Sequence, residues 1–151
     1  MMGGAVSETR ASVRFPATPP KVRECLLYLR EWLHGVVDDV GEVELVLAEL
    51  LNNVAEHGYP ADTGGDVSVT LEVEQGSLRL EICDQGGVLP EFLMAHKTLP
   101  DPLDLPEGGF GWPLIHALTE DISYNRKDGV NQLQCRMPLS AGPEFGMTEP
   151  V

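Results

Sequence analysis

Apolar residues change their spacing partway along the chain, and this change predicts a domain that contains both helices and strands. From Val22 to Val54 they recur every three or four positions, as at Val43, Val46 and Leu50, which is typical of helices with one buried face. From Val67 onward they alternate with polar residues, which is typical of strands joined in hairpins. The predicted helices span 19–34, 41–57 and 112–119, and the predicted strands span 12–17, 67–73, 78–82, 122–125 and 130–139. Grouped helices and hairpin-linked strands predict an α+β fold, with a mixed, mostly antiparallel sheet and helices on one face.

Three segments lack this periodicity. Residues 1–11 are small and polar, so we expect a flexible N-terminus, and residues 140–151 are expected to form a flexible tail. Residues 85–111 are rich in proline and glycine, with a short helical stretch near 91–97, and a loop that long inside a domain usually serves function. The folded domain is therefore predicted to span 12–139.

The charge balance narrows the classes of partner. Ten Lys and Arg stand against 24 Asp and Glu, a formal net charge of −14. Such a surface repels nucleic-acid phosphates and anionic lipids, so we expect no direct nucleic-acid binding and no membrane binding. The first residues show no secretory signal, and Cys25, Cys83 and Cys135 form no paired motif. These features predict a single-domain cytoplasmic protein whose cysteines are reduced.

A polar stripe follows one edge of the predicted second helix. Glu49, Asn53 and His57 are each four residues apart, so they lie one above another at the rim of the apolar face. Such a stripe can line a cleft between helix and sheet, where Glu49 suits a general base and the Asn53 carbonyl suits a hard cation such as Mg²⁺. The alternative is that all three are the solvated shoulder of an amphipathic helix.

Two glycine-containing segments could bind a ligand as well. Asp84 ends a predicted strand before Gly86, so its carboxylate can accept a hydrogen bond from a ligand's exocyclic amine, although Asp and Gly also form ordinary turns. The run 108–111 (GGFG) precedes a predicted helix, where exposed N–H groups and the helix dipole favour phosphate, although the run could be only a hinge. No lysine adjoins a glycine run, which excludes a P-loop.

The three motifs, in this order, resemble the nucleotide-binding boxes of the GHKL, or histidine-kinase-like, ATPase superfamily. Residues 49–59 (ELLNNVAEHGY) look like its N-box, residues 82–87 (ICDQGG) like its G1 box and residues 107–115 (EGGFGWPLI) like its G2 box. The form of the N-box and the chain length resemble most the bacterial anti-sigma factor serine/threonine kinases. The resemblance covers residues 12–139.

The resemblance implies a Bergerat-type two-layer α/β sandwich that binds ATP and Mg²⁺. It assigns Asn53 to Mg²⁺ on the triphosphate, Asp84 to the adenine amino group and Glu49 to general-base catalysis. Residues 88–107 match the ATP lid. The cofactor-binding set that it implies is Asn53, His57, Asp84, Gly86, Gly108, Gly109, Phe110 and Gly111.

The resemblance also implies an activity and two partners. Such kinases phosphorylate a Ser or Thr of an anti-anti-sigma (STAS-domain) protein, and they sequester a sigma factor. The family is often dimeric, so a homodimer is expected. A net charge of −14 would speed association with a basic surface such as the DNA-binding face of a sigma factor.

Two departures from the family pattern keep other functions open. The usual G1 pattern is Asp-x-Gly-x-Gly, but residue 88 is Val, and the lid segment contains one cation, Lys97. Phosphoryl transfer depends on electrostatic stabilisation of the transferred group. The alternative is a non-catalytic partner-binding module of the same fold, with a structural nucleotide or none. A third function, the catalytic domain of a histidine kinase, is disfavoured because the residues before position 12 offer no phosphoacceptor helix pair.

Overall fold

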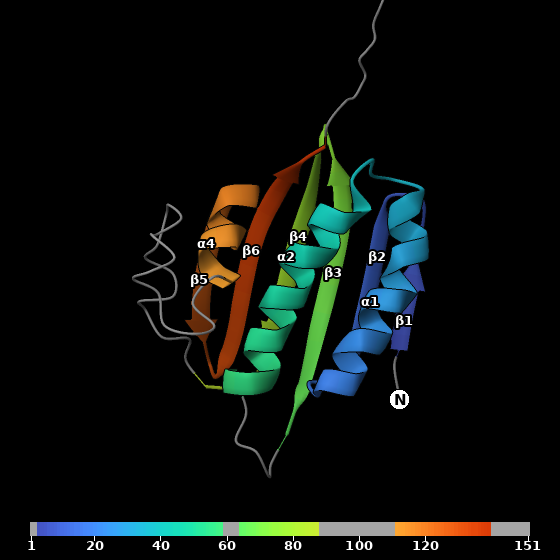
Figure 1. Ribbon diagram of the computed structural model, residues 1–151. Coiled ribbons are helices and arrows are strands. Elements are labelled where there is room, and N and C mark those ends of the chain that lie inside the picture. Colours follow the sequence, from blue (N-terminus) through green and yellow to red (C-terminus); the bar gives the residue numbers. More distant parts are fainter. Residues whose placement is uncertain (1–2, 59–63, 88–110, 140–151) are drawn as a thin grey trace, which may run out of the picture.

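Helices cover one face of a six-stranded sheet in the computed structural model, which describes residues 3–58, 64–87 and 111–139 (Figure 1). The strands are β1 (Gly3–Val6), β2 (Arg10–Pro16), β3 (Asp66–Glu74), β4 (Ser77–Asp84), β5 (Glu120–Lys127) and β6 (Val130–Pro138). The helices are α1 (Pro19–His34), α2 (Val40–Asn53) and α4 (Gly111–Leu118), and a π-helical turn, η1 (Val54–Gly58), follows α2. Across the sheet the order is β1-β2-β3-β4-β6-β5, and each neighbouring pair is antiparallel. The predicted α+β fold is confirmed, with antiparallel pairing throughout the described strands.

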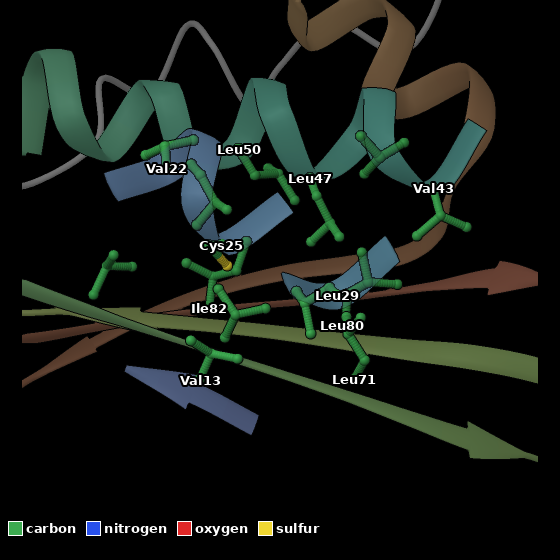
Figure 2. Close-up of a cluster of buried hydrophobic side chains, with 14 of the residues drawn as sticks. Val13, Val22, Cys25, Leu29, Val43, Leu47, Leu50, Leu71, Leu80 and Ile82 are labelled. Carbon is green, nitrogen blue, oxygen red and sulfur yellow. The ribbon is translucent and has the colours of Figure 1, made fainter. Parts of the chain in front are cut away.

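The core lies between the sheet and the helices. Every second residue of β4 is buried, and the helices contribute the residues spaced three or four apart. Figure 2 shows side chains of α1 and α2 meeting those of the strands beneath them. Each fully buried aliphatic side chain contributes about 1.5–3 kcal/mol to folding. The core residues contributed by the helices and the sheet include Val22, Cys25, Leu29, Val43, Leu47, Leu50, Leu71, Leu80 and Ile82.

Two tight turns fix the register of the hairpins. Gln75 and Gly76 join β3 to β4 with φ of 38° and 82°, and Asp128 and Gly129 join β5 to β6 with φ of 54° and 78°. A two-residue turn with positive φ at both positions matches the twist of the flanking strands. Glycine adopts this conformation without steric cost, which explains its place at the second position of both turns.

The N-terminus differs from its prediction. The segment expected to be flexible contains β1, which pairs with β2 through Gly4 and Val13, and the start of β2 itself. The indole Nε1 of Trp32 in α1 donates a hydrogen bond of 2.8 Å to the backbone oxygen of Ser7, between the two strands. The four residues of β1 (GGAV) are all exposed, so no apolar alternation marks this edge strand in the sequence.

The second helix also ends earlier than predicted. It is α-helical only to Asn53 and continues as a π-helix to Gly58, whereas an α-helix to residue 57 was expected. The side-chain Nδ2 of Asn53 donates to the backbone oxygen of Glu49 at 2.8 Å, and such bonds compete with helical backbone pairing. The α-helical register therefore does not continue from Asn53 to His57. The predicted lid 88–107 and tail 140–151 lie outside the described residues.

Candidate functional site

Residues from the end of α2 and the end of β4 line a small pocket. Both of these ends lie at the lower end of the sandwich in Figure 1. The volume of the pocket is about 20 Å³, which holds roughly one water molecule. This volume is smaller than that of a purine ring. Apolar side chains form the walls of the pocket, with a few polar groups among them, as in sites that orient a small ligand. The lining residues are Leu50, Asn53, Val54, Ile82, Asp84, Tyr124, Asn131 and Leu133.

Asp84 presents one carboxylate oxygen that no described residue uses. It is the last residue of β4 and only 9% exposed. Its Oδ1 accepts hydrogen bonds from the backbone N–H of Gly86 and from Nδ2 of Asn131, both at 2.8 Å. Among the described residues no hydrogen bond reaches its Oδ2. A buried carboxylate with one oxygen fixed and one available is suited to accept a hydrogen bond from a ligand's amine.

Asn53 presents its side-chain oxygen. Its Nδ2 is engaged by the backbone oxygen of Glu49, so the amide is held with Oδ1 as the end left for a ligand. An amide oxygen is a common ligand of Mg²⁺, which usually completes its shell with water and phosphate oxygens. The π-helical turn begins at the next residue, Val54, and such turns are frequent at functional sites.

Glu49 lies one turn before Asn53 on α2 and does not line the pocket. Its side chain is half-buried, and within the described part of the chain it makes no hydrogen bond. The backbone of His57 lies in η1, but its side chain is outside the description. The structure therefore joins Asn53 and Asp84 at one pocket, and Glu49 is not among the residues that line it.

The glycine run is described only at its last residue. Gly111 is the first residue of α4, one residue before the predicted start of this helix at residue 112. The other three predicted binding residues of the run, Gly108, Gly109 and Phe110, lie outside the described residues. Gly86 is buried, and its backbone N–H closes the turn onto Asp84.

Asn131 is a site residue that the sequence did not reveal. Its side chain is 3% exposed and contacts both sides of the site. Nδ2 donates to Asp84 Oδ1 at 2.8 Å and to the backbone oxygen of Gly87 at 2.8 Å. Oδ1 accepts from the hydroxyl of Tyr124 at 2.6 Å and from a guanidinium nitrogen of Arg126 at 2.8 Å. One pattern in the sequence indicates this residue. Asn131 lies on the same buried face of β6 as Leu133, Cys135 and Met137, and it is the polar residue of that series.

Two of the three cysteines belong to the core, as expected. Burial raises the pKa of the Cys25 and Cys135 thiols from 9.0 to about 12. Cys83 is half-buried on the opposite face of β4, and partial burial and the nearby Glu81 raise the pKa of its thiol as well. A raised pKa lowers the thiolate fraction, so these sites are poorly reactive. In the described ranges, no helix has the length and apolar character needed to cross a membrane.

A family comparison identifies the class of domain to which this fold belongs. Residues 15–137 match the family described as "Histidine kinase-like ATPase domain", and the chain belongs to that family. The predicted superfamily is thereby confirmed. Among solved structures, the chain resembles the RsbU and RsbW domains of Rv1364c from Mycobacterium tuberculosis, with a TM-score of 0.56 and 21% identity. That match covers 85% of this chain and 32% of the other, and it supports the shared fold.

Curated relatives narrow the comparison within the family. Serine-protein kinase RsbW of Oceanobacillus iheyensis is 26% identical over 130 residues, covering 78% of this chain and 80% of the relative. Anti-sigma F factor of Geobacillus kaustophilus is 26% identical over 91 residues, covering 60% of this chain and 62% of the relative. The second match thus spans less than two thirds of that relative's length.

Proposed function

We propose that this protein is an ATP-dependent serine/threonine kinase that acts as an anti-sigma regulator. One observation carries the proposal most directly: Asp84 and Asn53 meet at one pocket, each with a side-chain oxygen left for a ligand. An amine of a base and a hard cation are the two groups that these oxygens fit. Membership of the ATPase family, and relatives named serine-protein kinase and anti-sigma factor, support the same function.

The proposed residues divide the binding of Mg·ATP among β4, α2 and the start of α4. Asp84 Oδ2 would accept a hydrogen bond from the adenine amino group, and Asn53 Oδ1 would hold the Mg²⁺ on the triphosphate. The amides at Gly109 and Gly111, before and at the start of α4, would face the phosphates, with Gly108 and Phe110 beside them. His57 and Gly86 complete the proposed set.

Glu49 is the proposed general base. ATP supplies the phosphoryl group. Catalysis of its transfer depends mainly on positioning the reactants and on stabilising the charge of the transferred group. Glu49 lies one helical turn before Asn53, the residue proposed to hold Mg²⁺. There Glu49 would orient the Ser or Thr hydroxyl and accept its proton as the oxygen attacks the γ-phosphorus, the bond from the γ-phosphorus to the bridging oxygen breaks and ADP leaves.

The proposed partners are a sigma factor and an anti-anti-sigma protein of the STAS class. The anti-anti-sigma protein would supply the phosphorylated hydroxyl, and the sigma factor would be held inactive. A net charge of −14 favours a basic partner surface and predicts binding that weakens as salt rises. A homodimer and a cytoplasmic location remain predictions.

Transfer of ³²P from [γ-³²P]ATP to STAS-domain proteins of the same genome tests the kinase. We expect Glu49→Gln to slow transfer about 100-fold or more while leaving nucleotide affinity near that of wild type. Glu42→Gln, the same change two turns away in the first turn of α2, is the matched control and should transfer at the wild-type rate. Equal rates for Glu49→Gln and wild type would rule out the base role.

A non-catalytic partner-binding module is the second candidate, and the size of the pocket favours it. The cavity of about 20 Å³ is smaller than a purine ring. Saturable binding of a sigma factor or STAS protein that is unchanged by ATP, with no phosphate transfer, would identify this function.

A further inference from the structure

Asn131 occupies a position that an apolar residue would ordinarily fill. It faces inward from β6, two residues before Leu133, and is 3% exposed. A buried amide is costly unless its donors and acceptors are all satisfied. Its place in an apolar series therefore calls for a compensating network.

That network saturates the amide of Asn131. Nδ2 has acceptors on Asp84 Oδ1, on the Gly87 oxygen and, at 3.3 Å, on the Gly86 oxygen. Oδ1 has two donors, the Tyr124 hydroxyl and the Arg126 guanidinium. The chemistry fixes the orientation of the amide, because a flipped amide would set oxygen against a carboxylate and carbonyls. Asn131 thus has no hydrogen-bonding capacity left for a ligand.

We infer that Asn131 is a positioning residue of the nucleotide site: it locks Asp84 so that Oδ2 alone faces the base. The inference rests on the proposed function. Asp84 Oδ1 already receives two donors, from Gly86 and from Asn131, so the carboxylate cannot turn without breaking both bonds. The single acceptor that remains selects a base with an exocyclic amine, because a carbonyl at that place would meet it oxygen to oxygen.

Arg126 and Tyr124 hold Asn131 from the neighbouring strand. One guanidinium nitrogen of Arg126 reaches the Gly86 oxygen at 2.7 Å as well as Asn131 Oδ1. The Tyr124 hydroxyl reaches the same Oδ1 at 2.6 Å. The turn after β4 is thereby tied to the β5–β6 hairpin, and the selectivity of Asp84 depends on residues more than 35 positions away in the sequence.

Selectivity between two nucleotides tests this role, since a merely structural role would weaken both alike. The affinities of the full chain for Mg·ATP and Mg·ITP are measured by calorimetry; ITP carries a carbonyl oxygen in place of the exocyclic amine. Asn131→Ala is expected to lower the ATP-to-ITP affinity ratio about tenfold or more, through weaker ATP binding. Asn131→Asp, of equal size, should do the same because it sets a second carboxylate against Asp84. Asn125→Ala, an exposed asparagine of β5, should keep the wild-type ratio.

A second, more conservative variant tests the same role in case Asn131→Ala does not fold. Tyr124→Phe removes one donor to Asn131 and keeps the ring, and it should lower the ratio about two- to tenfold. In the nucleotide-free protein, the Gly86 amide proton should exchange faster in Asn131→Ala than in Asn125→Ala, because its acceptor Asp84 is no longer fixed.

The outcomes separate the two claims. Folded Asn131 and Tyr124 variants with the wild-type ratio would overturn the positioning role and leave ATP binding intact. A folded wild-type protein that binds ATP and ITP equally would overturn it as well. Failure of the folded wild-type protein to bind ATP would overturn the proposed function, and the inference with it.

Discussion

Two leucines of α2 should respond very differently to the same truncation. Leu47 is fully buried against the sheet, whereas Leu45 on the opposite side of the helix is 40% exposed. Leu47→Ala removes buried carbons and leaves a cavity, which costs about 3 kcal/mol within a usual range of about 2–5 kcal/mol. Leu45→Ala loses little buried area and should cost about 1 kcal/mol or less.

The comparison tests the orientation of α2, on which the position of Asn53 at the pocket depends. Urea unfolding followed by circular dichroism gives both free energies, and the slope should stay constant between variants. For a domain of this size 1 kcal/mol corresponds to about 2–4 °C, so Leu47→Ala should melt about 6–12 °C below wild type. Equal losses for the two variants, or a larger loss for Leu45→Ala, would refute the described face of α2 and the pocket built on it.

Two further predictions concern the edge strand and the buried thiols. A Cβ at Gly4 would lie 2.8 Å from the Tyr28 hydroxyl, whereas a Cβ at Gly3 would meet nothing within 4 Å. Gly4→Ala should therefore speed hydrogen exchange of the β1 amides, whereas Gly3→Ala should not. Equal exchange rates in the two variants would contradict the close approach of β1 to α1. The raised pKa of Cys25 and Cys135 favours folding below pH 9, and this contribution is lost as pH rises from 9 toward 12, at about 1.4 kcal/mol per pH unit for each thiol. Urea unfolding between pH 8 and pH 10.5 should show that decline, and a decline no smaller in Cys135→Val would contradict its assignment to the thiols.

The periodic elements could be predicted from sequence because burial of one face dictates them. The alternation at Val67, Val69 and Leu71 and the helical spacing at Leu47 and Leu50 mark the faces that form the core. Asp84 could be identified as a candidate because it ends a strand before glycines, a local feature.

The features that sequence did not predict depend on tertiary contacts or on weak local signals. β1 has no apolar alternation, and it is held by Trp32 and by pairing to β2. Asn131 acts on Asp84, which is 47 residues away in the sequence, so its role depends on a tertiary contact. The π-helical turn after Asn53 departs from a pattern that continues as an α-helix in the sequence.

A titration of the full chain with Mg·ATP tests the central claim most directly, with Asp84→Asn as the informative variant. In that variant the amide can keep an oxygen toward Gly86 and Asn131 while its nitrogen replaces Oδ2 in the pocket, so a donor would meet the base's amine. A hydrogen bond to a charged group contributes about 1.5–3 kcal/mol, which corresponds to roughly 10- to 140-fold in affinity.

We expect saturable binding of Mg·ATP at one site by wild type, and binding weakened by about that factor in folded Asp84→Asn. Wild-type binding that Asp84→Asn leaves unchanged would place the nucleotide elsewhere. Absence of binding to the folded wild-type protein would contradict the kinase function itself.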